Sequence, residues 1–162
     1  MRPISAAARA GSSVSNEAEA VLRELRQTAE SLKACLAQLE KVLAQPALDA
    51  SALISVRLKL AGLRLTRGPL INRVHDLLSG RVTEAQELML DQSRASHHSL
   101  LQTATKHTAN WTLEAISKNW PEYRRETRQL MREWVAKATR EERLVYPLIQ
   151  NCLHPERSER HV

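Results

Sequence analysis

Residues 22–43 read LRELRQTAESLKACLAQLEKVL, and this stretch predicts the fold. Its apolar residues recur at alternating steps of three and four, which places them along one side of a helix. This spacing is typical of helices that pack in bundles. Asn16 and Glu19 form a capping box that predicts the helix start near Asn16, and Pro46 follows its end. The apolar series comprises Leu22, Leu25, Ala29, Leu32, Leu36, Leu39 and Leu43.

A second helix is predicted from Asp49 or Ser51 to Ser79–Gly80, where the glycine can adopt the left-handed conformation that ends helices. One inward-facing position holds a charged residue, Arg67, and Gly68–Pro69 follows directly. Proline removes a backbone donor and clashes with the preceding turn, so we expect a kink or a local break there. The inward series comprises Val56, Leu60, Leu63, Arg67, Leu70, Val74 and Leu77.

Two more helices follow. The third opens at Thr83, with Gln86 completing a capping box, and a linker is predicted over Leu113–Lys118. The fourth is capped near Asn119, with Pro121 tolerated in its first turn. The inward series of the third helix is Leu90, Ser93, His97, Leu100, Ala104, His107 and Trp111. That of the fourth helix is Tyr123, Thr127, Leu130, Trp134, Lys137, Glu141, Leu144 and Leu148.

Long helices with short connections predict an all-α, antiparallel up-down four-helix bundle. Residues 16–153 would form the bundle, preceded by a disordered N-terminal arm over 1–15 and followed by a flexible tail over 154–162. The arm is rich in Arg, Ser and Ala and free of acids, so a targeting segment remains an alternative for it. No strand pattern occurs.

Composition narrows the functional classes. No apolar run reaches the ~18 residues that span a bilayer, so we expect no membrane partner. Cys35 and Cys152 are far apart and follow no metal spacing, which predicts reduced thiols and a cytoplasmic location. The net charge of +6 permits nucleic-acid binding. However, the densest basic cluster, Arg124 to Arg132, alternates with glutamates, which is typical of a solvated helix face.

The fourth helix carries a motif that resembles the closing motif of hemerythrin-like, cation-binding HHE domains. The string is REERLVYPL over 140–148, in which an acidic residue precedes an apolar-aromatic-Pro-Leu segment. WPEYRRETRQLM over 120–131 and Trp111 are similar to features of a subset of bacterial hemerythrin-like proteins. The resemblance covers Glu17 to Leu153 and implies a hemerythrin-like bundle with a di-iron centre that binds oxygen.

The resemblance also implies that most iron ligands have been replaced. It aligns Arg67 with a family histidine, Ile71 with the partner acid and Lys137 with a second histidine, while Glu141 remains as a former ligand. Arginine keeps its proton and cannot ligate iron. An inward Glu141 without a counter-charge would be costly to bury. We therefore expect Arg67, with or without Lys137, to pair with Glu141 in place of the missing cation; a surface-directed lysine is the alternative.

Histidines elsewhere leave an altered metal site as the alternative, built from His75, His97, His98 and His107 with Glu141. His97 and His98 are adjacent and point about 100° apart. His97 and His107 are separated by roughly 15 Å along a helix and cannot share one metal. The ordinary interpretation of all four is a partly exposed or hydrogen-bonded side chain.

Other chemistry is not indicated, because the chain has no phosphate-binding loop, nucleophile elbow, HExxH or CxxC motif. We therefore expect that the chain has no enzymatic activity and no cofactor. We expect it to be a regulatory or interaction module that binds a protein partner. The surface residues considered are Trp111, Trp120, Arg124 and Arg128, which can equally serve bundle-end packing and a solvated face. Iron or oxygen binding, and nucleic-acid binding, are the two alternatives. The sequence does not indicate the oligomeric state.

Overall fold

The computed structural model describes residues 6–154, and within this range the predicted all-α class is confirmed. The described residues contain helices and no strand. The helices are α1 (Ala6–Leu43), α2 (Ala50–Leu78), α3 (Glu84–Asn110), α4 (Leu113–Lys118), α5 (Trp120–Leu144) and α6 (Tyr146–Leu153). None of the helices between residues 6 and 154 combines the length and apolarity that a bilayer crossing requires.

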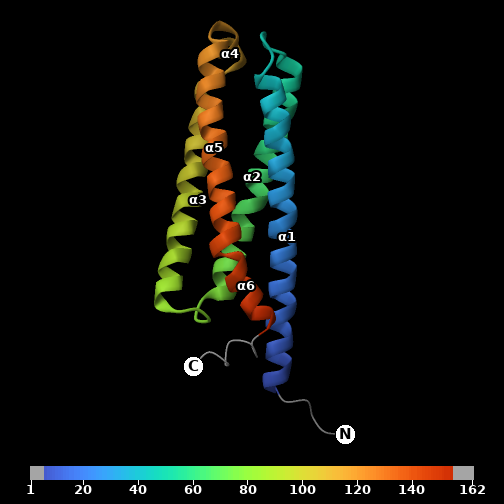
Figure 1. Cartoon of the computed structure of the whole chain (residues 1–162), viewed down its shortest axis with the longest axis vertical. Helices are drawn as coiled ribbons and strands as arrows, with labels where there is room; N and C mark the ends of the chain where they lie inside the picture. Colours follow the sequence, from blue (N-terminus) through green and yellow to red (C-terminus); the bar gives the residue numbers. More distant parts are fainter. Residues whose placement is uncertain (1–5, 155–162) are drawn as a thin grey trace.

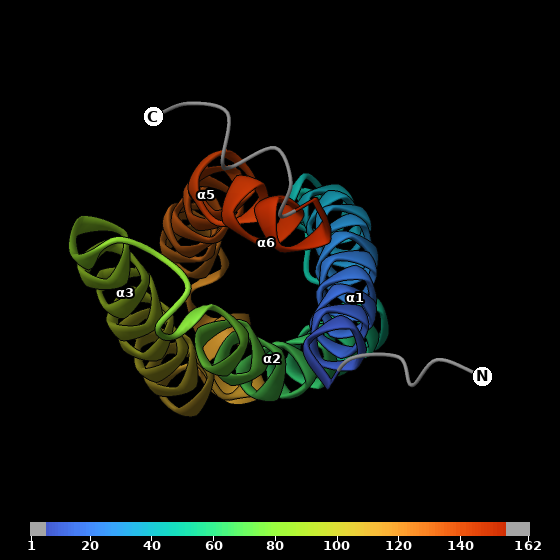
Figure 2. The same ribbon diagram turned by 90° about the horizontal axis from the view of Figure 1, so that it is seen from below.

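The four long helices α1, α2, α3 and α5 lie side by side and run alternately up and down (Figure 1). Viewed along their axes, they surround a common centre in the order α3, α2, α1, with α5 and α6 closing the ring (Figure 2). The most extensive contact joins α1 to α2, and α6 packs on α1. Side chains at inward positions of all four long helices therefore converge along one axis.

The start of α1 differs from the prediction. The helix begins at Ala6, and Asn16 lies inside it as an exposed residue, so the predicted arm is wrong for residues 6–15. Alanine-rich sequence favours the helix locally, and tertiary contacts extend it. Val14 packs against the core, and Ser15 Oγ donates to the carbonyl oxygens of Cys152 and Leu153 at 3.4 and 3.5 Å. Residues 1–5 lie outside the described residues.

Helix α2 begins and ends as predicted. The Asp49 side chain accepts from the backbone N–H of Ala52, and Gly80 has φ 70°. Of the expected kink or local break near Arg67, the break does not occur, because the helix continues through Pro69. Pro69 and Leu65 are both exposed, so water can satisfy the Leu65 carbonyl that loses its N–H partner.

The connection between α3 and α5 is more ordered than predicted. The capping box of Thr83 and Gln86 is confirmed. The predicted linker Leu113–Lys118 forms the short helix α4, capped by Thr112. Ile116 is fully buried, and its burial provides the tertiary contact that holds the short helix α4 in place.

The predicted fourth helix is divided in two. Asn119 caps α5 as expected, with Pro121 in the first turn, but the helix ends at Leu144. Pro147 has no backbone N–H, so the chain turns at Val145 before α6 begins. Residues 155–162, most of the predicted tail, lie outside the described residues, and His154 follows α6 without helical structure.

The inward series of α1 is buried throughout, as predicted. Three apolar clusters follow one another along the axis. The α6-end cluster includes Leu25, Leu70, Leu90 and Val145; the central cluster includes Leu32, Leu36, Leu100 and Trp134; the α4-end cluster includes Leu43, Leu53, Ile116 and Tyr123. Between the α6-end and central clusters lies a polar layer to which every long helix contributes a polar side chain or a carbonyl group.

Candidate functional site

Three charged side chains occupy this polar layer and form the ion cluster: Arg67 from α2, with Lys137 and Glu141 from α5. Their exposed fractions are 2%, 8% and 3%, so all three face the interior, as predicted. The 3/4 spacing of α5 places Lys137 and Glu141 one turn apart on the inward face, and Arg67 reaches them from α2.

The predicted pairing of Arg67 with Glu141 is confirmed, and of the two alternatives for Lys137 the structure shows the inward one. Arg67 Nη2 donates to Glu141 Oε2, and Arg67 Nη1 donates to Thr28 Oγ1 of α1 at 3.0 Å. Lys137 Nζ lies 2.9 Å from Glu141 Oε1 without the alignment of a hydrogen bond. The lysine instead donates to the carbonyl oxygen of Ser93 in α3 at 2.9 Å. The cluster thus draws on all four long helices.

The ion cluster carries two cations against one carboxylate, and this chemistry does not fit an iron centre. A metal ion beside Glu141 would meet the positive charges of Arg67 and Lys137 directly. Ile71, one turn after Arg67, is buried in the α6-end cluster and offers no ligand atom. The residues at these positions therefore serve packing and ion pairing.

His97 lies beside the ion cluster as a buried histidine, and no described residue forms a hydrogen bond with either of its ring nitrogens. Its ring meets Trp134 edge-on, with the ring centroids 6.0 Å apart. Burial in the core and the positive charge of Lys137 lower the pKa of His97 to about 4. The imidazole is therefore neutral at neutral pH, and it packs as an aromatic side chain.

The other histidines are dispersed, so the alternative metal site from the sequence is wrong. His75 Nε2 lies 2.9 Å from Asp91 Oδ1, and exposed His98 contacts Gln102. His107 contacts Thr127 and the ring of Tyr123, and burial lowers its pKa. Across residues 6–154, no three His, Cys, Asp or Glu side chains come close enough to hold a metal ion.

The four residues considered as an interaction surface are mostly engaged inside the molecule. Trp120 is buried, stacks on Tyr123 and donates from Nε1 to the Gln45 carbonyl at 3.2 Å, so the surface prediction is wrong for Trp120.

Each of the remaining three contacts another side chain of the molecule. Half-buried Trp111 donates from Nε1 to Glu126 at 2.6 Å. The Arg124 guanidinium lies 5.9 Å from the centre of the Trp120 ring, and Arg128 pairs with Glu40 of α1 at 2.7 Å. The contacts of Trp111 and Arg128 link α5 to the end of α3 and to α1, whereas the Arg124–Trp120 contact lies within α5.

Sequence reasoning missed an apolar row on the outer side of α2, which we name the outer row: the exposed Ile54, Leu58 and Leu65, with the half-buried Ala61 between them. The exposed fractions of Ile54, Leu58 and Leu65 are 40%, 68% and 78%. The steps of four, three and four place the row within an arc of about 60° on the helix. That arc lies opposite the buried face with Val56, Arg67 and Leu70. The same spacing rule applied to both faces of α2 would have found it.

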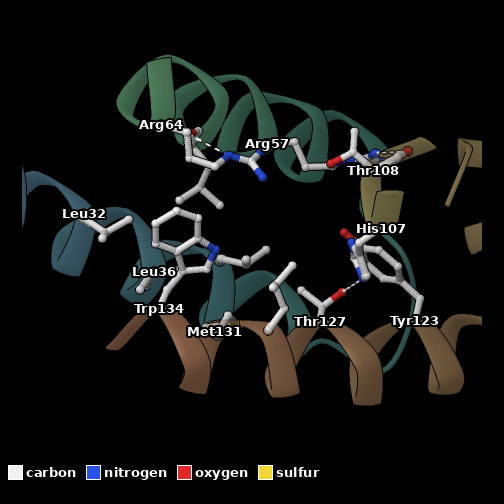
Figure 3. Close-up of a pocket in the computed structure, with 13 residues that line it drawn as sticks. Leu32, Leu36, Arg57, Arg64, His107, Thr108, Tyr123, Thr127, Met131 and Trp134 are labelled. Carbon is white, nitrogen blue, oxygen red and sulfur yellow. Dashed lines mark hydrogen bonds between the residues drawn. The ribbon is translucent and has the colours of Figure 1, made fainter. Parts of the chain in front are cut away.

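A cavity was also missed. It has a volume of about 50 Å³ and lies among α1, α2, α3 and α5, between the central and α4-end clusters. Leucines and Trp134 form one side, while Arg64 of α2 reaches toward it from the opposite side (Figure 3). No periodicity signals such a gap, because it depends on how side chains of four helices fit together.

We predict that Glu141→Ala lowers the free energy of unfolding by about 3–5 kcal/mol, because Arg67 and Lys137 would remain buried without a partner. Chemical denaturation measures this change. The matched control is Glu142→Ala, which removes an exposed carboxylate from the next position and should cost less than about 1 kcal/mol. A loss below about 1 kcal/mol for Glu141→Ala would show that the ion cluster does not stabilise the fold.

We also predict acid sensitivity from His97. Because its folded pKa is about 4, below the unfolded value, the unfolded chain binds more protons as pH falls. The contribution of His97 is therefore complete above pH ~6.5 and declines toward pH 4, by about 3 kcal/mol. Denaturation across this range should show a shallower pH dependence for His97→Leu. Exposed His98→Leu is the control, and an unchanged slope in both variants would contradict the prediction.

Comparison with known proteins identifies no relative of this chain. No protein-family model matches the chain, and searches of curated proteins and of solved structures found no similar chain. The hemerythrin-like resemblance therefore stays a prediction that rests on the residues quoted from α5 and α6.

Proposed function

We propose that this chain is a non-catalytic, regulatory protein-interaction module on a hemerythrin-like scaffold, and that it docks a partner through α2. The observation that carries the proposal is the outer row. Large apolar side chains remain exposed there, although the opposite face of α2 already packs in the core. A helix that is apolar on two faces has a second surface to bury.

The scaffold part of the proposal rests on helix order and on the closing motif. Four long helices that alternate in direction fit the antiparallel four-helix bundle implied by the resemblance (Figure 1). In the motif, Glu141 points into the core and Tyr146 is buried, while Pro147 sets the turn into α6. We infer that Arg67, Ile71, Lys137 and Glu141 occupy former ligand positions, and that the two cations replace the metal charge.

The proposed lack of catalytic activity is supported by the lack of solvent access to the charged groups of the ion cluster. The ionisable groups of the ion cluster are almost completely buried, so a substrate from solvent does not reach them. Their hydrogen-bonding capacity is directed to Thr28 and to the Ser93 carbonyl. The free thiols of Cys35 and Cys152 support a reducing, cytoplasmic compartment.

The partner that fits the outer row is a protein helix with its own apolar row. Steps of four, three and four match the seam along which two helices pack side by side. The row extends over about 16 Å, enough for three turns of a partner helix. On one flank, Ser51, Ser55, Gly62 and Thr66 are small and exposed, which lets a second backbone approach closely.

We predict that the double variant Leu58→Glu with Leu65→Glu abolishes partner binding without unfolding the chain, because both side chains are exposed. Sedimentation velocity from low to high micromolar concentration detects a second copy as the partner. Co-purification of full-length tagged chain at native expression level detects another protein.

Leu88→Glu is the matched control, since Leu88 is an exposed leucine on α3, outside the row. An association that the control retains and the double variant loses supports the proposal. If wild-type chain forms no association, or if the double variant keeps every association of the wild type, the outer row is not a docking site.

Metal analysis separates the proposal from the iron-binding alternative. We expect iron well below one atom per chain in untagged protein from iron-rich medium, because the cations of the ion cluster repel a metal at Glu141. About two irons per chain with an oxo-bridge absorption would favour the alternative instead. Nucleic-acid binding has weaker support, since Arg125 pairs with Glu122 and Arg128 with Glu40.

A further inference from the structure

The cavity has an apolar wall suited to a hydrocarbon group. Leu32 and Leu36 of α1 and Trp134 of α5 line it at the central cluster, and Met131 lies beside them (Figure 3). None of these side chains carries a charge. An apolar group of a ligand placed there would therefore move from water into apolar surroundings, which is favourable.

The opposite side of the cavity is cationic. Figure 3 shows Arg57 and Arg64 reaching from α2, with Arg57 directed to the end of α3 and Arg64 toward the cavity. Arg57 donates to the carbonyl oxygens of Thr108 and Trp111, both at 3.1 Å. Within residues 6–154, Arg64 makes a single hydrogen bond, from Nε to the Leu60 carbonyl at 3.3 Å.

Arg64 is thus a half-buried guanidinium that pairs with no carboxylate among the described residues. Burial, and then the neighbouring charge of Arg57, lower its pKa. None of the 13 residues that line the cavity is acidic. Arginine presents a planar pair of donors that matches a carboxylate. A bound carboxylate would therefore compensate the positive charge of Arg64.

The volume limits what can enter. A cavity of about 50 Å³ has room for about three or four waters, or a chain of about four carbons. It is too small for a long acyl chain. An inorganic anion would fill the cationic side and leave the leucine and tryptophan wall without a partner. A ligand with one charged head and a short apolar chain satisfies both sides.

We propose that this cavity binds a short-chain monocarboxylate of about four carbons, with its carboxylate held by Arg64 and its hydrocarbon chain packed against Leu36 and Trp134. The site is independent of the outer row, because it faces the bundle interior. His107 and Thr127, which contact each other at 3.2 Å, border it as further polar groups.

Isothermal titration of the full chain with acetate, propionate, butyrate, octanoate and 1-butanol tests the site. We expect affinity to rise about fourfold for each CH₂ from acetate to butyrate, and to fall for octanoate, which exceeds the cavity. Butanol should bind at least about tenfold more weakly than butyrate, because it lacks the charge that Arg64 recognises. These measurements need no variant.

Arg64→Met keeps the apolar stem and removes the charge. It should weaken butyrate at least about tenfold, leave butanol unchanged, and raise the melting temperature of the ligand-free chain, since a desolvated cation is removed. Arg23→Met, an exposed arginine of α1, is the control and should change none of these. No saturable binding of butyrate, or equal binding of butyrate and butanol by the wild type, overturns the proposal.

Discussion

The ion pair between Arg67 and Glu141 in the centre of the molecule constrains the rest of the structure. A carboxylate that is 3% exposed needs positive charge within contact distance, and the second cation, Lys137, needs an acceptor of its own. These requirements are met only when α2, α3 and α5 stand at matching levels. The pairing therefore specifies the register of the helices, which apolar seams alone define loosely.

The same layer separates the core into regions with different properties. On the α6 side, mostly aliphatic side chains from α1, α2, α3 and α6 pack together with Val145. On the α4 side, aromatic residues and arginines meet, and the cavity lies beside them. The two proposals come from this asymmetry and from the double-sided character of α2. The cationic interior and the exposed outer row are both features of that one helix.

Several features followed from local sequence. Asp49, Thr83 and Asn119 cap helices where expected, since the capping hydrogen bonds are made within three residues. Arg67, Lys137 and Glu141 could be expected to pair because charged residues at inward positions have few other solutions. Errors arose where long-range contacts outweighed local signals. Helix α1 begins before Asn16 because Val14 and Ser15 pack against the α6 end, and Leu113–Lys118 is helical because Ile116 is buried.

Periodicity and caps were thus enough to establish the helical class, most helix ends and the identity of the buried charges, since all of these depend on neighbours within a turn or two. Packing alone determined which groups complete the ion cluster, Thr28 and the Ser93 carbonyl. It also left Arg64 facing a cavity. These outcomes depend on the rotation and level of each helix against the others, and a one-dimensional pattern carries no information about either.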